Sequence, residues 1–315
     1  MSIIEANNVT KRFNDKLVLD NINFKIKEGE VFGLIGPNGA GKSTLINIMT
    51  SILKSTSGDI KIGGYSITKE ALKAKEYIGL VPQEIALIET VSAVDNLEFF
   101  GSLYGLKGKL LKERIDEALE VIGLKEKRRE KVKKFSGGMK RRLNIAAAIM
   151  HHPKILIMDE PTVGIDPQSR NHIFEFTRKI NREEKTTVIY TSHYMEEVEM
   201  LCNNLFIMDL GKEVAYGNKN YIKSMLGDKN RVILKLENYT GELLLNLRSL
   251  GGVIECEEEE RFIKLLVHEN DFELNSLLKV LENENIKIKG INFEEPTLEE
   301  VFLSLTGKKL RDQLP

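Results

Sequence analysis

Short apolar runs separated by polar turns fill the first part of the chain. They predict strands at residues 3–9, 17–19, 22–26, 31–35 and 77–81, and a hairpin at 58–67. A glycine-rich loop follows the fourth of these strands, and residues 43–50 predict a helix. From about residue 84 to residue 150, apolar residues recur at helical spacings of three and four. We therefore expect an inserted helical subdomain within a strand-rich domain.

Apolar strands return at residues 155–158 and 187–190, and each precedes a predicted helix. Buried parallel strands that alternate with helices indicate an α/β sheet covered on both faces. The fold class predicted for this part is therefore α/β, with a mixed sheet and the inserted helices.

The pattern changes after residue 227. Strands are predicted at 231–236, 253–257, 262–267 and 286–293, and helices at 242–250 and 272–281. This order, βαββαβ, is the ferredoxin-like pattern of a small α+β domain. A last amphipathic helix at 296–307 begins at Thr297, with Glu300 at the capping-box position. We interpret the acidic run 257–260 as a solvated turn.

These patterns predict two domains. The first covers residues 1–227, with its helical subdomain at about 84–150, and the second is a C-terminal accessory domain at 228–315.

Charge and hydropathy exclude several classes of protein. Lys and Arg number 46 against 47 Asp and Glu, so the net charge of -1 argues against a nucleic-acid partner. No apolar run approaches the roughly 18 residues needed to span a bilayer, and the N-terminal residues lack the pattern of a secretory signal. Cys202 and Cys256 have no metal-site spacing and are expected to be neutral thiols in the cytosol. Any membrane-spanning part must then be a separate polypeptide.

The sequence GPNGAGKST at residues 36–44 fits the phosphate-binding pattern G-x-x-x-x-G-K-[ST] between a strand and a helix. Glycines let backbone amides converge on phosphate oxygens, and the helix adds its positive end. Lys42 would bind the β- and γ-phosphates, and Ser43 would bind Mg²⁺. The predicted nucleotide contacts are Gly36, Pro37, Asn38, Gly39, Ala40, Gly41, Lys42, Ser43 and Thr44. The alternative is a glycine-rich turn without function, and the position between a strand and a helix favours the phosphate-binding interpretation.

A second motif, ILIMDEP at residues 155–161, places two acids after a buried strand. Ligands of open α/β sheets bind at such carboxyl ends. Asp159 suits Mg²⁺ coordination, and Glu160 can orient and deprotonate an attacking water. Two acids after a strand more commonly cap a helix, but the phosphate loop upstream favours the catalytic interpretation.

A third motif, FSGGMKRRL at residues 135–143, completes a set that resembles the nucleotide-binding subunits of ABC transporters, in order over residues 1–225. The resemblance implies ATP and Mg²⁺ as ligands. It also implies that Ser136, Gly137 and Gly138 contact the γ-phosphate held by a second copy across a dimer interface. Met139 replaces the glutamine that is commonest in the family, which puts one side-chain contact in doubt.

Four further positions match the family one by one. The resemblance implies that Phe13 stacks on adenine, that Gln83 contacts Mg²⁺ and the lytic water, and that Asp166 communicates between the two sites. His193 would bond the γ-phosphate and stabilise transition-state charge. Each has a plain alternative: a core ring, a loop amide, a helix cap and a structural histidine. His151, His152, His172 and His268 match no such position.

One phosphate loop and one SGG signature per chain imply a dimer that closes on ATP and opens after hydrolysis. The ending PTLEEVFLSLTG, with the FSGGMKRRL form, looks like the ATP-binding subunits of drug-resistance exporters. These work at the cytoplasmic face of the membrane with separately encoded permeases of the ABC-2 type. The helical block would receive the permease through residues such as Leu97, Phe99, Phe100, Leu103 and Tyr104, which are just as easily helix core. For the C-terminal domain, dimer stabilisation or regulation is a hypothesis.

Three other classes of protein fit less well. An ABC ATPase acting on DNA ends would need a long coiled coil between Lys42 and Asp159, and no sustained heptads occur there. Translation-type ABC proteins normally carry two nucleotide-binding domains in one chain, and a GTPase-like switch lacks the SGG signature. A soluble ABC-type ATPase in a non-transport role remains the alternative.

Overall fold

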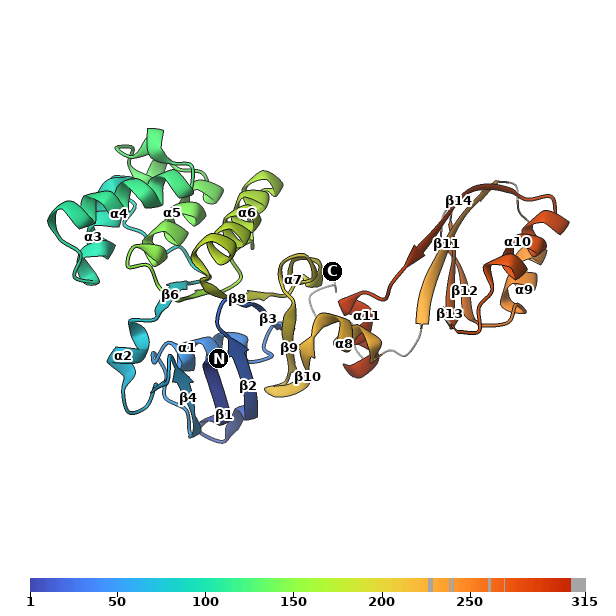
Figure 1. The fold of residues 1–315 in the computed structure, drawn as a ribbon, viewed down its shortest axis with the longest axis horizontal. Helices are drawn as coiled ribbons and strands as arrows, with labels where there is room; N and C mark the ends of the chain where they lie inside the picture. Colours follow the sequence, from blue (N-terminus) through green and yellow to red (C-terminus); the bar gives the residue numbers. More distant parts are fainter. Residues whose placement is uncertain (226–228, 238, 240, 260–261, 269, 307–315) are drawn as a thin grey trace. The chain divides into compact units, whose positions relative to one another are not determined.

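The computed structural model describes residues 1–225, 229–237, 239, 241–259, 262–268 and 270–306 (Figure 1). The chain forms two compact units, of which the first is Met1–Lys219 and the second begins at Asn220. The boundary expected at 227 and 228 lies outside the described residues.

An antiparallel sheet opens the first unit, with strand order β2-β1-β4-β5. Its strands are β1 (Ser2–Phe13), β2 (Lys16–Lys27), β4 (Ser57–Ile62) and β5 (Tyr65–Ser66). The prediction of separate strands at 17–19 and 22–26 is wrong, because both runs belong to β2. Asn21 has a φ of 52°, and the register to β1 shifts there. The polar residues that resemble a turn therefore form a β-bulge within one strand.

The central sheet has the order β10-β9-β3-β8-β7-β6. Its strands are β3 (Val31–Ile35), β6 (Ile78–Val81), β7 (Ile155–Met158), β8 (Thr187–Ser192), β9 (Asn204–Asp209) and β10 (Lys212–Asn218). All neighbouring pairs are parallel except β9 with β10. Every residue of β3, β7 and β8 is buried, as expected for parallel strands covered on both faces. The predicted mixed α/β fold is confirmed.

Helices α1 (Lys42–Met49), α6 (Pro167–Glu184) and α7 (Met195–Leu201) accompany this sheet, and α2 (Ala71–Lys75) follows β5. The first begins at Lys42, directly after Gly41 and within the glycine-rich motif, and the other two follow the loops that leave β7 and β8. Because the parallel strands end at the same edge, the loops after β3, β6, β7 and β8 meet there.

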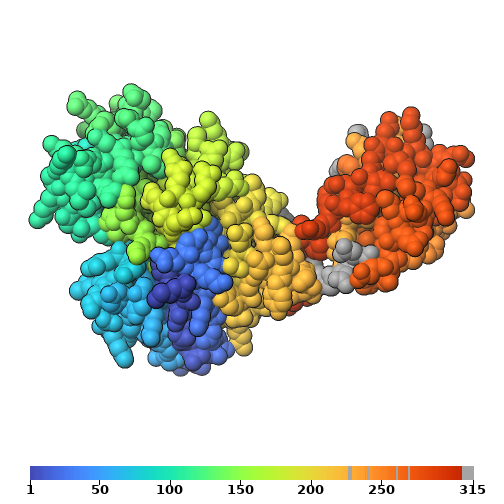
Figure 2. All heavy atoms as spheres, in the orientation of Figure 1, coloured from blue at the N-terminus to red at the C-terminus, as the bar shows by residue number. Residues whose placement is uncertain are grey.

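The inserted helical subdomain consists of α3 (Ala93–Leu103), α4 (Gly108–Val121) and α5 (Gly137–Ile149), with two short 3₁₀ turns between α4 and α5. These helices enclose a core of their own that includes Leu97, Leu119 and Leu143. In Figure 2 this green lobe and the blue N-terminal strands occupy opposite ends of the first unit. Residues 84–91 form a loop rather than helix, so helical structure begins later than the pattern predicts.

His151, just past the end of α5, joins this subdomain to the central sheet. Its Nε2 lies 3.0 Å from the carbonyl oxygen of Ile78 in β6, and its ring stacks on Tyr104 with 3.6 Å between centroids. Burial lowers the pKa of His151 to about 4. The ring is therefore neutral at physiological pH and acts as a structural contact.

The second unit contains β11 (Lys229–Glu237), α9 (Gly241–Arg248), β12 (Val253–Glu259), β13 (Phe262–His268), α10 (Leu274–Asn283) and β14 (Lys287–Glu294). The antiparallel sheet has the order β12-β13-β11-β14, which is the ferredoxin-like arrangement. The acidic residues 257–259 lie in β12, so their interpretation as a turn is wrong; Glu260 lies outside the described residues. All three are exposed on this edge strand, so their carboxylates remain in water.

Two helices flank this sheet in sequence, α8 (Lys219–Ser224) and α11 (Leu298–Thr306). The predicted capping box of the last helix is present. The backbone N–H of Thr297 donates to Glu300 Oε2 at 2.8 Å, and the N–H of Glu300 donates to Thr297 Oγ1 at 3.3 Å.

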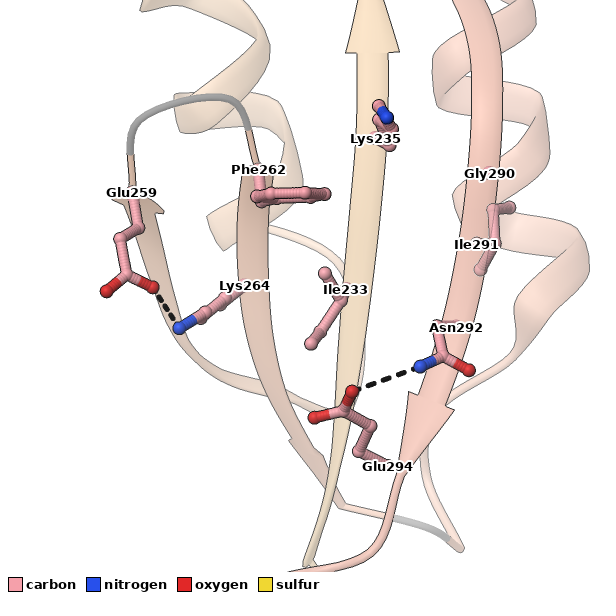
Figure 3. A pocket seen from close by; sticks show the side chains of 9 residues that line it. All are labelled: Ile233, Lys235, Glu259, Phe262, Lys264, Gly290, Ile291, Asn292 and Glu294. Atoms are coloured by element: carbon pink, nitrogen blue, oxygen red, sulfur yellow. Dashed lines mark hydrogen bonds and ion pairs between the residues drawn. The ribbon is translucent and has the colours of Figure 1, made fainter. Parts of the chain in front are cut away.

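A hollow of about 680 Å³ lies on the open face of this sheet (Figure 3). Ile233 and Phe262 supply apolar lining, and Gly290 leaves space because it has no side chain. Two polar contacts lie within the lining: Lys264 pairs with Glu259, and Asn292 Nδ2 donates to Glu294 Oε1 at 3.0 Å. A third polar residue, Lys235, has its Nζ 5.8 Å from the ring centroid of Phe262. No phosphate-binding loop borders this hollow.

No helix among the described residues is long and apolar enough to cross a membrane. Cys202 and Cys256 are both buried and free, and burial raises the pKa of each thiol. The expectation of neutral thiols agrees with this environment.

Candidate functional site

The glycine-rich loop borders a cleft of about 640 Å³ at the carboxyl edge of the central sheet. The lining consists of Lys16, Leu17, Val18, Pro37, Asn38, Gly39, Ala40, Gly41, Lys42, Ser43, Thr44, Gln83, Glu160 and Leu210. Gly41 has a φ of 108°, and a Cβ there would lie 2.8 Å from Leu19 Cδ2. A Cβ on Gly36 would lie 2.3 Å from the carbonyl oxygen of Met208. Both positions therefore require glycine for the loop to keep this shape.

Lys42 places a buried cation at the base of this loop. Its side chain is 5% exposed, and Nζ donates to the carbonyl oxygen of Gly36 at 2.7 Å. The same atom lies 3.2 Å from Glu160 Oε1. Because α1 begins at Lys42, the positive end of that helix faces the cleft with the ammonium group. This end of the cleft is suited to phosphate.

Glu160 lies at the centre of the predicted catalytic residues. Its Oε2 accepts a hydrogen bond from Gln83 Nε2 at 3.3 Å and lies 3.4 Å from His193 Nδ1. The residue has a φ of 46°, in the left-handed region, and its backbone N–H donates to Thr191 Oγ1 at 2.8 Å. A non-glycine residue in this conformation is strained, and such strain is typical of functional sites. The fold thus brings Lys42, Gln83 and His193 around one carboxylate.

Asp159 is the second buried acid. Its Oδ1 accepts from Thr191 Oγ1 at 2.8 Å. Burial raises the pKa of Asp159 and the neighbouring charge of Glu160 adds to this effect, while Thr191, Lys42 and Ser43 oppose it. Two buried carboxylates therefore share one buried ammonium group.

This charge balance suits a divalent cation, which would offset the excess negative charge. No cluster of three or more His, Cys, Asp or Glu residues in the described chain could hold a metal alone. A cation here would need the hydroxyl of Ser43, the amide of Gln83, water and phosphate besides Asp159.

The SGG signature does not border the cleft in the same chain. Ser136 is exposed and caps α5, where its hydroxyl accepts from the N–H of Met139 at 3.3 Å. A Cβ on Gly138 would lie 2.0 Å from Ser169 Oγ, so glycine is required for α5 to approach α6. Because Ser136 is exposed and lies outside the cleft of its own chain, it and the start of α5 are available to another molecule.

Asp166 caps α6 and lies beside the signature. Its Oδ1 accepts from the N–H of Ser169 at 2.9 Å, and hydrogen bonds from Ser169 lower the pKa of Asp166. A Cβ on Gly138 would lie 3.1 Å from Asp166 Oδ2, so the two segments are in close contact. The helix-cap alternative considered from the sequence is therefore present.

Phe13 is exposed by 45% at the end of β1, and Lys11 Nζ lies 4.8 Å from its ring centroid. The ring is therefore not part of the core. Its partner across the β1–β2 turn is Lys16, which lines the cleft. This location is compatible with stacking on a base.

Sequence reasoning missed two residues that support the site. Thr191 bridges the two acids through one hydroxyl, and it lies within the apolar run of β8 without any distinguishing pattern. Arg141 of α5 is buried, and its Nη1 donates to the carbonyl oxygen of Pro82 at 2.7 Å while Nη2 donates to that of Gln83. It thereby holds the loop that carries Gln83. Burial lowers the pKa of Arg141, and Asp159 opposes that effect.

Two family profiles match this chain. The profile described as ABC transporter matches residues 19–163, and the profile described as ATP-binding protein DrrA1-3-like, C-terminal domain, matches residues 217–306. Among curated proteins, the linearmycin resistance ATP-binding protein LnrL of Bacillus subtilis is 47% identical over 98% of this chain and 100% of its own length. The daunorubicin resistance ATP-binding protein DrrA3 of Streptomyces coeruleorubidus is 33% identical over 98% of this chain and 97% of its own.

Solved structures of ATP-binding cassettes also match. CbiO1 of Clostridium perfringens, part of an ABC transporter complex, has a TM-score of 0.64 at 31% identity, over 72% of this chain and 95% of that protein. The cassette MJ0796, solved as a dimer bound to ADP and Pi, has a TM-score of 0.63 at 28% identity, over 68% of this chain and 98% of that protein.

The raised pKa of Asp159 predicts an effect on stability. Because the folded-state pKa lies above the unfolded value, stability decreases as pH rises through that interval, and ionised Asp159 is unfavourable at pH 7. Asp159→Asn should therefore raise the unfolding temperature without Mg²⁺ by a few degrees. It should also remove the stabilisation that Mg²⁺ gives the parent protein when ATP supplies the phosphate ligands; each kcal/mol corresponds to about 2–4 °C. Thermal unfolding in ATP with either EDTA or Mg²⁺ measures both.

Asp15→Asn, at an exposed turn, is the control and should behave as the parent protein. An Asp159→Asn protein that is less stable in EDTA and still gains as much from Mg²⁺ would contradict the assignment.

Proposed function

We propose that two copies of this chain close around two Mg-ATP molecules and thereby drive a separate membrane permease. The chain belongs to the ABC transporter family and is an ATP-binding, ATP-hydrolysing exporter subunit. The observation that carries this proposal is the convergence of Lys42, Gln83 and His193 on Glu160 beside the phosphate loop. The signature Ser136, Gly137 and Gly138, which would complete the site, does not border the cleft of its own chain.

Phosphate binding would begin at the loop and at Lys42. Because Lys42 Nζ already lies 3.2 Å from a carboxylate oxygen, a γ-phosphate oxygen could take that place with little movement of the ammonium group. The exchange would leave the Glu160 carboxylate facing the γ-phosphate, with Gln83 and His193 on its other oxygen. The loop amides and the start of α1 would hold the remaining phosphate charge.

Hydrolysis then requires one water in line with the γ-phosphate. Glu160 would accept a proton from that water, Gln83 would orient it, and His193 would stabilise charge on the transferred group. The P–O bond to ADP breaks as the bond to the water oxygen forms, which leaves ADP and phosphate. Asp159, Ser43 and Gln83 would hold Mg²⁺, which neutralises phosphate charge when bound.

The second copy would supply Ser136, Gly137 and Gly138. Ser136 is exposed at the start of α5, where a hydroxyl and free helix amides can face an anion. A γ-phosphate would contact both copies only in the closed pair, so ATP would favour closure and hydrolysis would release it.

The permease would dock on the helical subdomain at the cytoplasmic face of the membrane. Leu97 is buried in the helical core, whereas Leu103 is 67% exposed and Phe99 47% exposed on the same helix, α3. Exposed apolar residues of this kind mark interaction surfaces when they cluster. The names of the linearmycin and daunorubicin resistance relatives support a toxic compound as cargo. A soluble ATPase without a permease is the alternative.

Replacing the general base tests the chemistry. Glu160→Gln should retain ATP binding and lower kcat by about 10²–10⁴-fold, because a positioned base contributes that much to proton transfer. ATP should then accumulate a dimer, measured by size-exclusion chromatography with light scattering. Hydrolysis at the parental rate would remove Glu160 from this role.

Mixing two inactive proteins tests the shared site. Lys42→Ala and Ser136→Arg should each be inactive alone, whereas an equal mixture should regain part of the activity. A mixed dimer then combines the intact loop of one copy with the intact signature of the other. Steady-state ATPase assays of the mixture measure this. If each copy used its own signature, the mixture would show no more activity than its components.

A charge on α3 tests the docking surface. Leu103→Glu should reduce the fraction of the chain that sediments with membranes of its own cells by about tenfold, equivalent to about 1.4 kcal/mol of lost affinity. ATPase activity of the purified protein should not change. Ile52→Glu, at another site that is 66% exposed, is the matched control. Equal sedimentation of all three proteins with the membranes would place the docking surface away from Leu103, and a parent protein that does not sediment would favour the soluble alternative.

A further inference from the structure

Glu197 of α7 is a buried carboxylate that the proposed chemistry does not use. Its side chain is 3% exposed, and one oxygen, Oε2, accepts three hydrogen bonds. The donors are Thr162 Oγ1 at 2.7 Å, Tyr190 OH at 3.0 Å and Ser192 Oγ at 3.1 Å. Burying a carboxylate costs several kcal/mol unless it is paired and hydrogen-bonded. Packing alone does not require such a group.

The three donors come from the segments that carry the catalytic residues. Thr162 lies two residues after Glu160, on the loop that leaves β7. Ser192 is the last residue of β8 and directly precedes His193, and its hydroxyl also accepts from the N–H of Tyr194 at 2.9 Å. Oε2 of Glu197 therefore fixes the distance between the loop that carries Glu160, the proposed base, and the loop that carries His193.

The other oxygen of Glu197 reaches a third segment. Its Oε1 lies 3.5 Å from Arg170 Nε, in the first turn of α6, four residues after the cap Asp166. The guanidinium carbon of Arg170 also lies 5.8 Å from the ring centroid of Tyr194. Helices α6 and α7 pack beside β8 (Figure 1). The carboxylate thus lies between the segments of Glu160, His193 and Asp166.

Two further facts support an electrostatic role. Burial raises the pKa of Tyr190, and the charge of Glu197 raises it further, so the phenol remains a donor. Glu197 also lies in the first turn of its helix, where a negative charge is favourable.

We propose that Glu197 is a positioning residue that sets the relative placement of Glu160, His193 and the Asp166 helix, so that nucleotide contact at one segment is transmitted to the other two. The inference rests on the proposed roles of Glu160 and His193. It concerns catalysis rather than ATP affinity, because none of these contacts involves the phosphate loop. An error of about 1 Å in such placement can cost about 10²-fold in rate.

Substituting the carboxylate by its amide tests the proposal. Glu197→Gln keeps the shape but removes the negative charge and replaces one acceptor oxygen by an NH₂ group. That group must face either the three hydroxyls or Arg170 Nε, so one of the two sets of contacts is lost whichever way the amide is turned. We expect kcat to fall by between about 10-fold and about 10²-fold, the latter being the rate loss for a misplacement of about 1 Å. KM for Mg-ATP should change less than about threefold. Circular dichroism establishes that the variant is folded. Glu196→Gln, one residue earlier on the exposed side of the same helix, should retain the parental kcat and KM.

A double-mutant cycle separates positioning from a merely structural role. If Glu197 acts through His193, adding Glu197→Gln to His193→Ala should lower the single-turnover rate far less than it lowers that of the parent. Losses that are additive both with His193→Ala and with Glu160→Gln, or an unchanged kcat in Glu197→Gln, would overturn the inference and leave the proposed function intact. Parental rates in both His193→Ala and Glu160→Gln would instead refute the proposed function. A thermal shift with no change in kcat would mean that Glu197 only stabilises the fold.

Discussion

The contact between Lys42 and Glu160 joins the two halves of the nucleotide site. The lysine begins the helix after β3, and the glutamate follows β7, which is separated from β3 in the sheet by β8. Both side chains are buried, so their charges interact in a medium that screens them less than water does. The parallel sheet makes this contact possible, because it directs the end of each strand to one edge.

The polar groups behind this pair come from β8. Thr191 bonds the backbone of Glu160 and the carboxylate of Asp159. One residue further, Ser192 turns to the opposite side of the strand and bonds Glu197. Because neighbouring residues of a strand point to opposite faces, consecutive hydroxyls support different parts of the site. The left-handed conformation of Glu160 is held by this arrangement.

The helical subdomain connects to the same edge through Arg141. Its guanidinium group holds the carbonyl groups of Pro82 and Gln83 from within the helix that begins at the signature serine. Movement of α5 would therefore move the loop that carries Gln83. In our proposal, this connection relates permease docking on α3 to the contacts around Glu160. The second unit has a separate core between its sheet and helices α9 and α10, and its hollow in Figure 3 has a different lining.

The sequence by itself determined the family, the α/β fold and the ferredoxin-like order of elements, because each depends on local patterns. The phosphate loop is one continuous segment, and ILIMDEP and FSGGMKRRL are short and distinctive. Only the tertiary structure decided that residues 17–19 and 22–26 form one bulged strand, since a bulge and a turn present the same polar residues. It also decided the contributions of Thr191, Arg141 and Glu197. Their partners are distant in sequence, and a threonine or glutamate without a motif becomes significant only when burial and hydrogen-bond geometry are known.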